Sequence, residues 1–483
     1  MVDRNNDAYS VARKNKDGNF DGKFFFAVST TGIVCRPSCP SPIAKEENVT
    51  YFSSLYDAIN KGYRPCLRCR PDIYTEFYTS NLDGEIIISD AMKLISEGFL
   101  NSNSVSDLAD YFHLSERYFR KLFVKNIGLS PTQIAKYNRA IFAKRMLINS
   151  DLAVTSIAFA SGFGSIRQFN NVFKDIFKVS PSDIRLETTN DLKAGTTMLL
   201  AYNKPFDFCQ VLEFMQPRMI KGIELVEKNR FTRTFNIRGI KGYFIVKDNP
   251  SKSSLELDVF CDDMSVFREI YYRVRKMFDL DTDFEKVKHS LSSDNYLKKL
   301  MGSKNVPRLP VAFNSYEFII RAILGQQITV KAATTLAARI VERAGIKSGI
   351  DIEGLEYVFP KLEELINLPL EDLGITKTRI KTIKNVNEAL TDEVFSLSVN
   401  QSHAKFYYEF TSVKGIGDWT ANYVAMRGLG MVDAFPAGDL WVINALKKEY
   451  GDMKIRDIKK RSDKWRPYRA YVTLFLWQSL GEV

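Results

Sequence analysis

The spacing of apolar residues changes several times along the chain. From about residue 85 to 186 apolar residues recur at intervals of three and four, which predicts amphipathic helices. From about 195 to 285 the pattern alternates, and a run such as Phe231–Ile237 predicts a strand. From 286 onward the helical spacing returns. The residues before about 75 are rich in turn residues and aromatics, which is typical of a small α+β module.

A chain of 483 residues is too long for one core, so these changes predict a multidomain protein. We expect a small α+β module, an all-α domain, a second α+β domain with a small sheet, and a second all-α domain. Their expected boundaries are 1–78, 85–187, 195–285 and 286–483.

The net charge of +11 and the isoelectric point of about 9.1 favour a polyanionic partner, most simply nucleic acid. A protein that is basic for other reasons stays an alternative. No signal peptide is apparent, and no apolar run approaches the roughly 20 residues that cross a bilayer. We therefore expect a cytoplasmic protein with no membrane partner. A nucleic-acid partner implies that it is associated with the nucleoid. We also expect a monomer.

Four of the six cysteines form one early cluster, with the spacing C-x3-C, 26 residues, then C-x2-C. Two close pairs joined by a loop let four thiolates meet tetrahedrally on one Zn²⁺, and a reducing compartment favours a metal over disulfides. The expected ligands are Cys35, Cys39, Cys66 and Cys69. From the spacing alone, a purely structural zinc site is the simpler interpretation.

The residues around these cysteines, Phe24–Cys39 and Gly62–Asp72, resemble the amino-terminal domain of Ada-type methyltransferases. The resemblance implies that Cys35 accepts a methyl group from a DNA methylphosphotriester, once per molecule, while the other three cysteines keep the metal. A zinc-held thiolate is electron-rich, and its methylation removes one negative charge, which favours binding to the phosphate backbone. Nearby arginines are candidate phosphate contacts, although a solvated basic face explains them equally well: Arg36, Arg64, Arg68 and Arg70.

An internal repeat lies in the first helical region, where Ser115–Phe123 recurs fifty positions later as Ser165–Phe173. Each copy reads as a helix, a turn and a second helix, with Ser115 as a plausible helix cap. Within Ser104–Arg185 the chain resembles the AraC-type DNA-binding domain. The repeated phenylalanines are predicted to be core.

The AraC-type resemblance implies that each second helix enters a major groove of DNA. The candidate readers of bases or phosphates are Arg117, Arg120, Arg167, Gln168 and Asn171. A helical spacer that touches no DNA is the alternative.

The remaining chain, from Tyr202 through Phe214 and from Val306 to the end, resembles AlkA-type 3-methyladenine DNA glycosylases of the helix-hairpin-helix class. The sharpest motif is Val413–Tyr423. Its glycines Gly415 and Gly417 allow close approach of the backbone to a phosphate, and Thr420 follows as a DNA contact. The family leads us to expect a monovalent cation at the carbonyls of this hairpin.

Asp439 is the expected catalytic residue. Loss of an alkylated base leaves an oxocarbenium-like sugar, which a carboxylate stabilises while it orients water. On sequence alone Asp439 is also a candidate helix cap. Trp419 stands where relatives with lyase activity carry a Schiff-base lysine, so we expect a monofunctional glycosylase. No cysteine follows Cys261, so the iron–sulfur cluster of some relatives is not expected.

The resemblance also implies a pocket that stacks a flipped base. Its expected members are Phe214, Gln326, Trp419, Tyr423 and Trp477, although lone aromatics are more often core. Gln327 falls where the family often has an apolar wedge, a departure that leaves the wedge unassigned. Arg466 and Arg469 are candidates for phosphate contacts or for pairing with acids.

Together these features predict a protein that senses methylphosphotriesters, activates alkylation-response genes in contact with RNA polymerase, and excises alkylated bases from double-stranded DNA. One alternative is a regulator that uses a glycosylase fold only to bind DNA. Another is an enzyme whose front half only recruits it to damage. The Pro-Cys-His-Arg motif of O6-methylguanine repair is absent from the sequence, so that activity is not expected.

Overall fold

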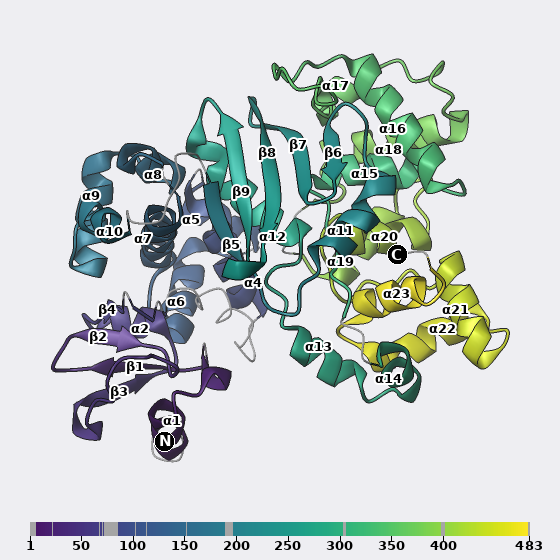
Figure 1. Ribbon diagram of the computed structural model, residues 1–483. Helices are drawn as coiled ribbons and strands as arrows, with labels where there is room; N and C mark the ends of the chain where they lie inside the picture. Colours follow the sequence, from purple (N-terminus) through teal and green to yellow (C-terminus); the bar gives the residue numbers. More distant parts are fainter. Residues whose placement is uncertain are drawn as a thin grey trace. The chain divides into compact units, whose positions relative to one another are not determined.

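The computed structural model describes residues 6–481 except 22, 67, 70, 72–85, 102, 113, 151, 189–196, 303–305 and 398–400. The chain folds into two compact units, one within residues 1–195 together with Phe267–Glu269, the other within Thr196–Val266 and Ile270–Val483 (Figure 1). None of the helices in the described part of the chain has both the length and the apolar character that a bilayer crossing requires.

The first unit begins with the expected small α+β module. Its elements are α1 (Asn6–Lys14), β1 (Phe25–Val28), β2 (Ile33–Cys35), β3 (Val49–Phe52), α2 (Leu55–Asn60) and β4 (Arg64–Pro65). The strands form one sheet in the order β3-β1-β2-β4, antiparallel except for the parallel pair β2-β4. Phe26 pairs with Cys35, and Val34 pairs with Pro65, so β2 and β4 each deliver a cysteine to the same end of the sheet.

The rest of the first unit is helical, as predicted. Its helices are α4 (Ile86–Glu97), α5 (Val105–Tyr111), α6 (Glu116–Ile127), α7 (Pro131–Asn149), α8 (Val154–Ala160), α9 (Ile166–Phe177) and α10 (Pro181–Thr188). Ser115 caps α6 by accepting a hydrogen bond from the Tyr118 N–H, and Ser165 caps α9 in the same way from Gln168. The four repeated phenylalanines are fully buried, which confirms their predicted place in the core.

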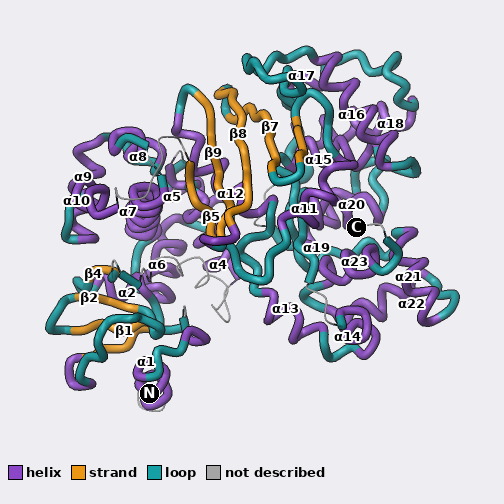
Figure 2. Tube along the Cα trace, viewed as in Figure 1, coloured by secondary structure: helices purple, strands orange, loops and turns teal. Residues whose placement is uncertain are grey.

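The second unit opens with a five-stranded antiparallel sheet in the order β5-β9-β8-β7-β6, drawn in orange in Figure 2. The elements here are β5 (Thr197–Ala201), α11 (Phe208–Met215), β6 (Glu224–Glu227), β7 (Arg230–Ile237), β8 (Ile240–Asn249), β9 (Ser254–Cys261) and α12 (Phe267–Met277), whose first three residues are grouped with the first unit. The predicted strand Phe231–Ile237 falls within β7.

The chain then returns to helices around one large apolar core. They are α13 (Phe284–Leu291), α14 (Asn295–Met301), α15 (Ser315–Leu324), α16 (Val330–Ala344), α17 (Leu362–Ile366), α18 (Lys377–Thr391), α19 (His403–Thr411), α20 (Asp418–Arg427), α21 (Leu440–Tyr450), α22 (Ile455–Ser462) and α23 (Arg469–Gln478). A buried ion-pair network ties the sheet to the helices, because Arg233 of β7 contacts both Glu224 of β6 and Glu317 of α15. The fold class therefore matches the prediction.

Candidate metal centre and active site

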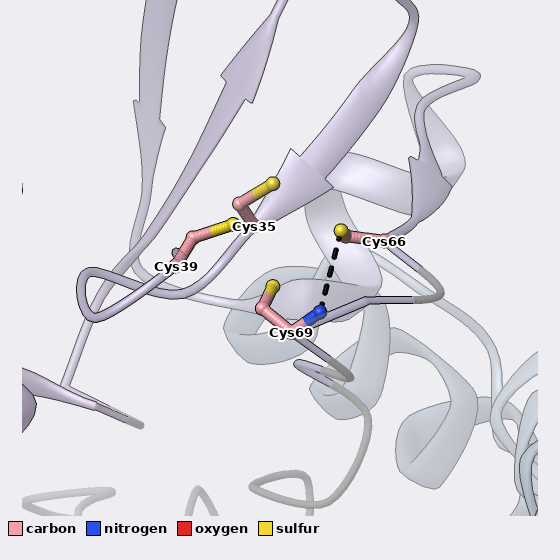
Figure 3. A group of neighbouring side chains, drawn as sticks. All are labelled: Cys35, Cys39, Cys66 and Cys69. Carbon is pink, nitrogen blue, oxygen red and sulfur yellow. Dashed lines mark hydrogen bonds between the residues drawn. The ribbon is translucent and has the colours of Figure 1, made fainter. Parts of the chain in front are cut away.

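The four clustered cysteines converge in the small module. Their sulfur atoms all lie within 4.8 Å of one another, and all four side chains are buried (Figure 3). Tetrahedral thiolates at a Zn–S distance of about 2.3 Å stand about 3.8 Å apart, so this arrangement fits one Zn²⁺. The cysteines also form the centre of the module's own apolar cluster, together with Phe26.

The electrostatics of the cluster call for a cation. Hydrogen bonding to the thiols of Cys39, Cys66 and Cys69, followed by burial, raises the pKa of Cys35. Four adjacent thiolates are therefore unstable without a positive charge between them, and Zn²⁺ supplies that charge. The donor set and its geometry fit the predicted zinc site.

The cysteine sulfurs differ in their other partners. The Cys66 sulfur accepts a hydrogen bond from the Cys69 N–H at 3.5 Å (Figure 3). The Cys69 side chain has a hydrogen bond with the backbone of Arg36, and the Cys39 side chain has one with the hydroxyl of Ser41. Within the described residues no backbone or hydroxyl donor to the Cys35 sulfur is found, and its hydrogen-bonding partners are the other three thiols.

Asp21 supports this centre, although no motif of the sequence points to it. Its carboxylate pairs with the Arg36 guanidinium and accepts hydrogen bonds from the N–H (3.0 Å) and hydroxyl (2.5 Å) of Ser38. The Nε of Arg36 also donates to the Cys69 carbonyl at 2.7 Å. Arg36 therefore braces the loop between two of the cysteines. Among the other candidate phosphate contacts, Arg64 is half-buried, Arg68 is exposed, and Arg70 lies outside the described residues.

The candidate DNA readers lie on the second helix of each repeated unit. Arg117 and Arg167 are exposed at the first turns of α6 and α9, as is Asn171 further along α9. Two of the candidates have partners already. Arg120 pairs with Glu116 at 2.6 Å, and the Gln168 side chain accepts a hydrogen bond from the Gly164 N–H at 3.1 Å.

The hairpin Val413–Asp418 joins α19 to α20, as the motif predicted, and its two glycines differ. Gly415 has a φ of +102°, and an added Cβ would lie 2.2 Å from the Thr382 hydroxyl of α18. Gly417 precedes α20, and a Cβ there would meet no protein atom within 4 Å. The fold itself therefore requires glycine at 415, whereas a side chain at 417 would enter open space.

The Asp439 side chain has four donors. Its Oδ1 accepts hydrogen bonds from the Trp477 indole (3.0 Å) and from the N–H groups of Trp441 (3.0 Å) and Val442 (3.2 Å), and its Oδ2 accepts one from the Trp419 indole (2.9 Å). Asp439 therefore caps α21, and these hydrogen bonds fix its carboxylate. Its catalytic role stays a prediction. Since it is only 7% exposed, the four donors offset the cost of burying its charge.

Aromatic rings surround this carboxylate. Trp419 stacks on Tyr423 with ring centres 4.9 Å apart, and the rings of Tyr423 and Trp477 are 6.3 Å apart. A cavity of about 1580 Å³ opens beside them within the second unit. Its lining includes Trp419, Tyr423, Trp477 and Asp439, together with Gln326 and Gln327. Phe214, which was expected in the pocket, is buried and is not among the lining residues; its ring contacts Arg218 and Arg427, which do line the cavity.

The polar residues around the cavity are placed as follows. Gln326 donates to the Gly415 carbonyl (3.3 Å) and to the Thr420 hydroxyl (3.0 Å), so it fastens the hairpin to the end of α15. Thr420 is itself buried. Gln327 is exposed with a φ of +56°, a left-handed conformation unusual for a residue other than glycine. Arg466 and Arg469 both pair with Asp433, in line with the pairing alternative.

Comparison with known families divides the chain in the same order. Residues 8–72 match the metal binding domain of Ada, and residues 108–187 match a helix-turn-helix domain. Residues 197–314 match the AlkA N-terminal domain, and residues 320–467 match the HhH-GPD superfamily of base excision DNA repair proteins.

Curated relatives match the whole chain or parts of it. A probable bifunctional transcriptional activator/DNA repair enzyme AlkA of Mycobacterium tuberculosis is 32% identical over 97% of this chain and 95% of its own length. DNA-3-methyladenine glycosylase 2 of Escherichia coli is 24% identical over 58% of this chain and 97% of its own. The bifunctional transcriptional activator/DNA repair enzyme AdaA of Bacillus subtilis is 29% identical over 35% of this chain and 78% of its own.

The fold and the two sites define a multidomain DNA repair protein that carries a four-cysteine zinc module, a helix-turn-helix domain and a helix-hairpin-helix DNA glycosylase. The chain belongs to the family of bifunctional transcriptional activators and DNA repair enzymes represented by the mycobacterial relative.

Proposed function

We propose that the chain repairs methylated DNA at two separate centres, a methyl-accepting thiolate at Cys35 and a base-excising carboxylate at Asp439. The observation that carries the proposal is the pairing of a four-sulfur cluster in one unit with a buried, four-donor carboxylate beside an aromatic cavity in the other.

At the first centre, Cys35 attacks the methyl carbon of a methylphosphotriester. A bond forms from Sγ to carbon, the carbon–oxygen bond breaks, and the phosphate leaves as an ordinary phosphodiester anion. Bound Zn²⁺ keeps the sulfurs deprotonated at neutral pH. Cys35 is the acceptor because its sulfur has no amide or hydroxyl donor within the described residues to reduce its nucleophilicity. Asp21 and Arg36 hold the loop that carries it.

Methyl transfer from alkylated DNA to protein tests this assignment. Wild type is expected to take up one methyl group per chain and then stop, and Cys35→Ala to take up none. The matched control is Cys209→Ala, which removes an exposed thiol in the other unit and should leave transfer unchanged. Full methyl uptake by Cys35→Ala would contradict the proposal.

At the second centre, Asp439 stabilises the sugar cation that forms as the bond from C1′ to the base nitrogen breaks. The electron pair leaves with the base, and a water molecule then adds to C1′ and loses a proton. Its four donors keep Asp439 fixed, and Oδ2, which accepts one hydrogen bond from the described residues, retains capacity toward water. Trp419 occupies the position of the lyase lysine, so the product is an abasic site without strand cleavage.

Release of 3-methyladenine from methylated DNA tests the second centre. Asp439→Asn should abolish release. Asp452→Asn, which changes an exposed aspartate one helix away, should not. Strand cleavage by purified wild type would overturn the monofunctional assignment.

The double helix-turn-helix binds specific DNA sequences and so brings the two centres to them. Arg117 and Arg167 are the proposed readers of the two major grooves, with Arg120, Gln168 and Asn171 beside them. Methylation of Cys35 removes one negative charge from the module, which strengthens binding to a promoter and activates transcription through RNA polymerase. The cation expected at the hairpin would have to share the carbonyls of Lys414 and Gly415 with the hydrogen bonds that they accept from Asn385 and Gln326.

A further inference from the structure

The second helices of the two helix-turn-helix units, α6 and α9, differ at one equivalent position. The repeat has a constant offset of fifty residues, so Ser115–Phe123 aligns with Ser165–Phe173 without a gap. Both helices begin directly after a capping serine, and in both the second residue is an exposed arginine. The first residue, however, is Glu116 in α6 and Ile166 in α9. The two copies therefore carry an acid and an aliphatic group at the same point.

Ile166 is an apolar side chain that lies in solvent. It is 39% exposed, whereas all the apolar residues further along α9 are buried. Since the Cα–Cβ bonds of a helix tilt toward its N-terminus, a residue of the first turn directs its side chain toward the leading end. In a helix-turn-helix domain that end contacts the base edges in the major groove. Ile166 is therefore positioned to contact bases with its methyl groups.

Glu116 keeps one carboxylate oxygen open to a ligand. Two nitrogens of Arg120, Nε at 2.7 Å and Nη2 at 2.6 Å, both contact its Oε1. Within the described residues no partner of its Oε2 is found. The Arg120 guanidinium compensates a negative charge that would otherwise repel the phosphates of DNA, while Oε2 can still accept a hydrogen bond. This pairing makes a carboxylate compatible with a surface that binds DNA.

We propose that the two helix-turn-helix units read different bases at this equivalent position, Ile166 a thymine and Glu116 a cytosine. The proposal rests on the proposed reading of DNA by α6 and α9. Among the four ordinary bases, thymine alone presents a methyl group in the major groove, and cytosine presents an amino group that a carboxylate can accept. Isoleucine has no hydrogen-bond acceptor, and a carboxylate loses hydration against a methyl group, so neither residue can replace the other. The protein therefore binds two half-sites of unequal sequence.

The probe is the duplex that the full-length wild type enriches from a pool with a randomised segment. Each thymine of this duplex is replaced in turn by uracil, which lacks only the methyl group. At one position the dissociation constant of the wild type should rise about 4-fold, the effect of leaving one methyl group unburied. Ile166→Ala should bind the thymine duplex more weakly by the same factor and should not respond to uracil there. The matched control is Val124→Ala, which shortens another exposed aliphatic side chain near the end of α6 and should keep the full response.

Exchanging the two residues tests the alignment of the two copies directly. In Ile166→Glu the preferred pair at the uracil-sensitive position should change from T·A to C·G, by about 10-fold in relative affinity. In Glu116→Ile a cytosine of the other half-site should give way to thymine. Because each exchange predicts a gain of binding to a new sequence, misfolding cannot imitate the result.

The absence of a uracil-sensitive position, or a full response of Ile166→Ala to uracil, would overturn the role of Ile166. An unchanged base preference in either exchange would overturn the assignment of the residue exchanged. If the wild type enriched no sequence from the pool, the proposed reading of DNA by α6 and α9 would itself fail.

Discussion

At the zinc module four sulfurs meet in a domain whose apolar cluster consists largely of those same cysteines, whereas in the glycosylase a single carboxylate lies at the edge of a large helical core. The module needs an external cation to hold its negative charge. Asp439 is instead held by two indoles and two backbone N–H groups that belong to the chain. At the first centre the same cysteines carry the reactive sulfur and hold the module together. At the second centre the reactive carboxylate can be changed without loss of the core that surrounds it.

Removal of zinc should have the largest effect, because it should inactivate the first centre and leave the second active. A strong chelator is expected to abolish methyl transfer and to unfold the module, because binding at structural zinc sites supplies roughly 10–16 kcal/mol of folding free energy. Base release should continue. Zinc content, methyl uptake and base release measured on one sample check this, and full methyl uptake by zinc-free protein would break the comparison.

Asp439→Asn should reduce base release by about 10³-fold or more, because the charge that stabilises the sugar cation is gone. The fold should persist, since asparagine caps helices about as well as aspartate. Turning an amide N–H toward the Trp419 indole costs about 1–3 kcal/mol at most. Thermal unfolding and single-turnover kinetics measure the two effects, and an unfolded variant would show that this centre also holds its domain together.

Trp477→Phe should reduce base release about 10-fold, since it keeps a ring in the wall but removes the indole donor to Oδ1. Trp465→Phe is the matched control, because it removes an indole donor to Asp294 away from the cavity. Equal losses of rate per folded molecule would mean that packing, and not the donor, matters.

The smallest effect concerns pH. His403 lies 3.0 Å from Asn422 Oδ1, and burial lowers the pKa of this imidazole below its usual 6.5. The unfolded chain therefore binds a proton more readily than the folded one, and stability falls as the pH drops below about 6.5. In His403→Gln this part of the loss should disappear. Denaturant unfolding of both proteins at pH 7.5 and 5.5 tests it, and parallel losses would argue against it.

The pattern of the sequence predicted much of this structure because its signals are local. The C-x3-C and C-x2-C pairs, the repeated Ser115–Phe123 unit and the Val413–Asp418 hairpin each specify a short segment whose chemistry depends on spacing. The strand Phe231–Ile237 followed from alternation. The sequence predicted Asp439 both as a cap and as a catalytic residue. The structure confirms the cap, and the catalytic role stays a prediction.

What the sequence could not predict depends on contacts between distant segments. Asp21 reaches Arg36 and Ser38 only through the fold, and Gln326 meets the hairpin 89 positions later. Arg427 stands in none of the motifs of the sequence, and its contacts with the Phe214 ring and the Pro310 carbonyl are visible only in the structure. Such residues carry no spacing signal of their own.

The cavity-facing side of α20 also constrains how this protein can change over time. Each residue inserted between Trp419 and Arg427 would rotate everything beyond it by about 100° and shift it by about 1.5 Å. A single-codon insertion or deletion would therefore turn either the indole or the guanidinium into the surrounding core. The intervening positions Thr420–Asn422 and Val424–Met426 are themselves buried, so the length of this helix and its composition are both constrained.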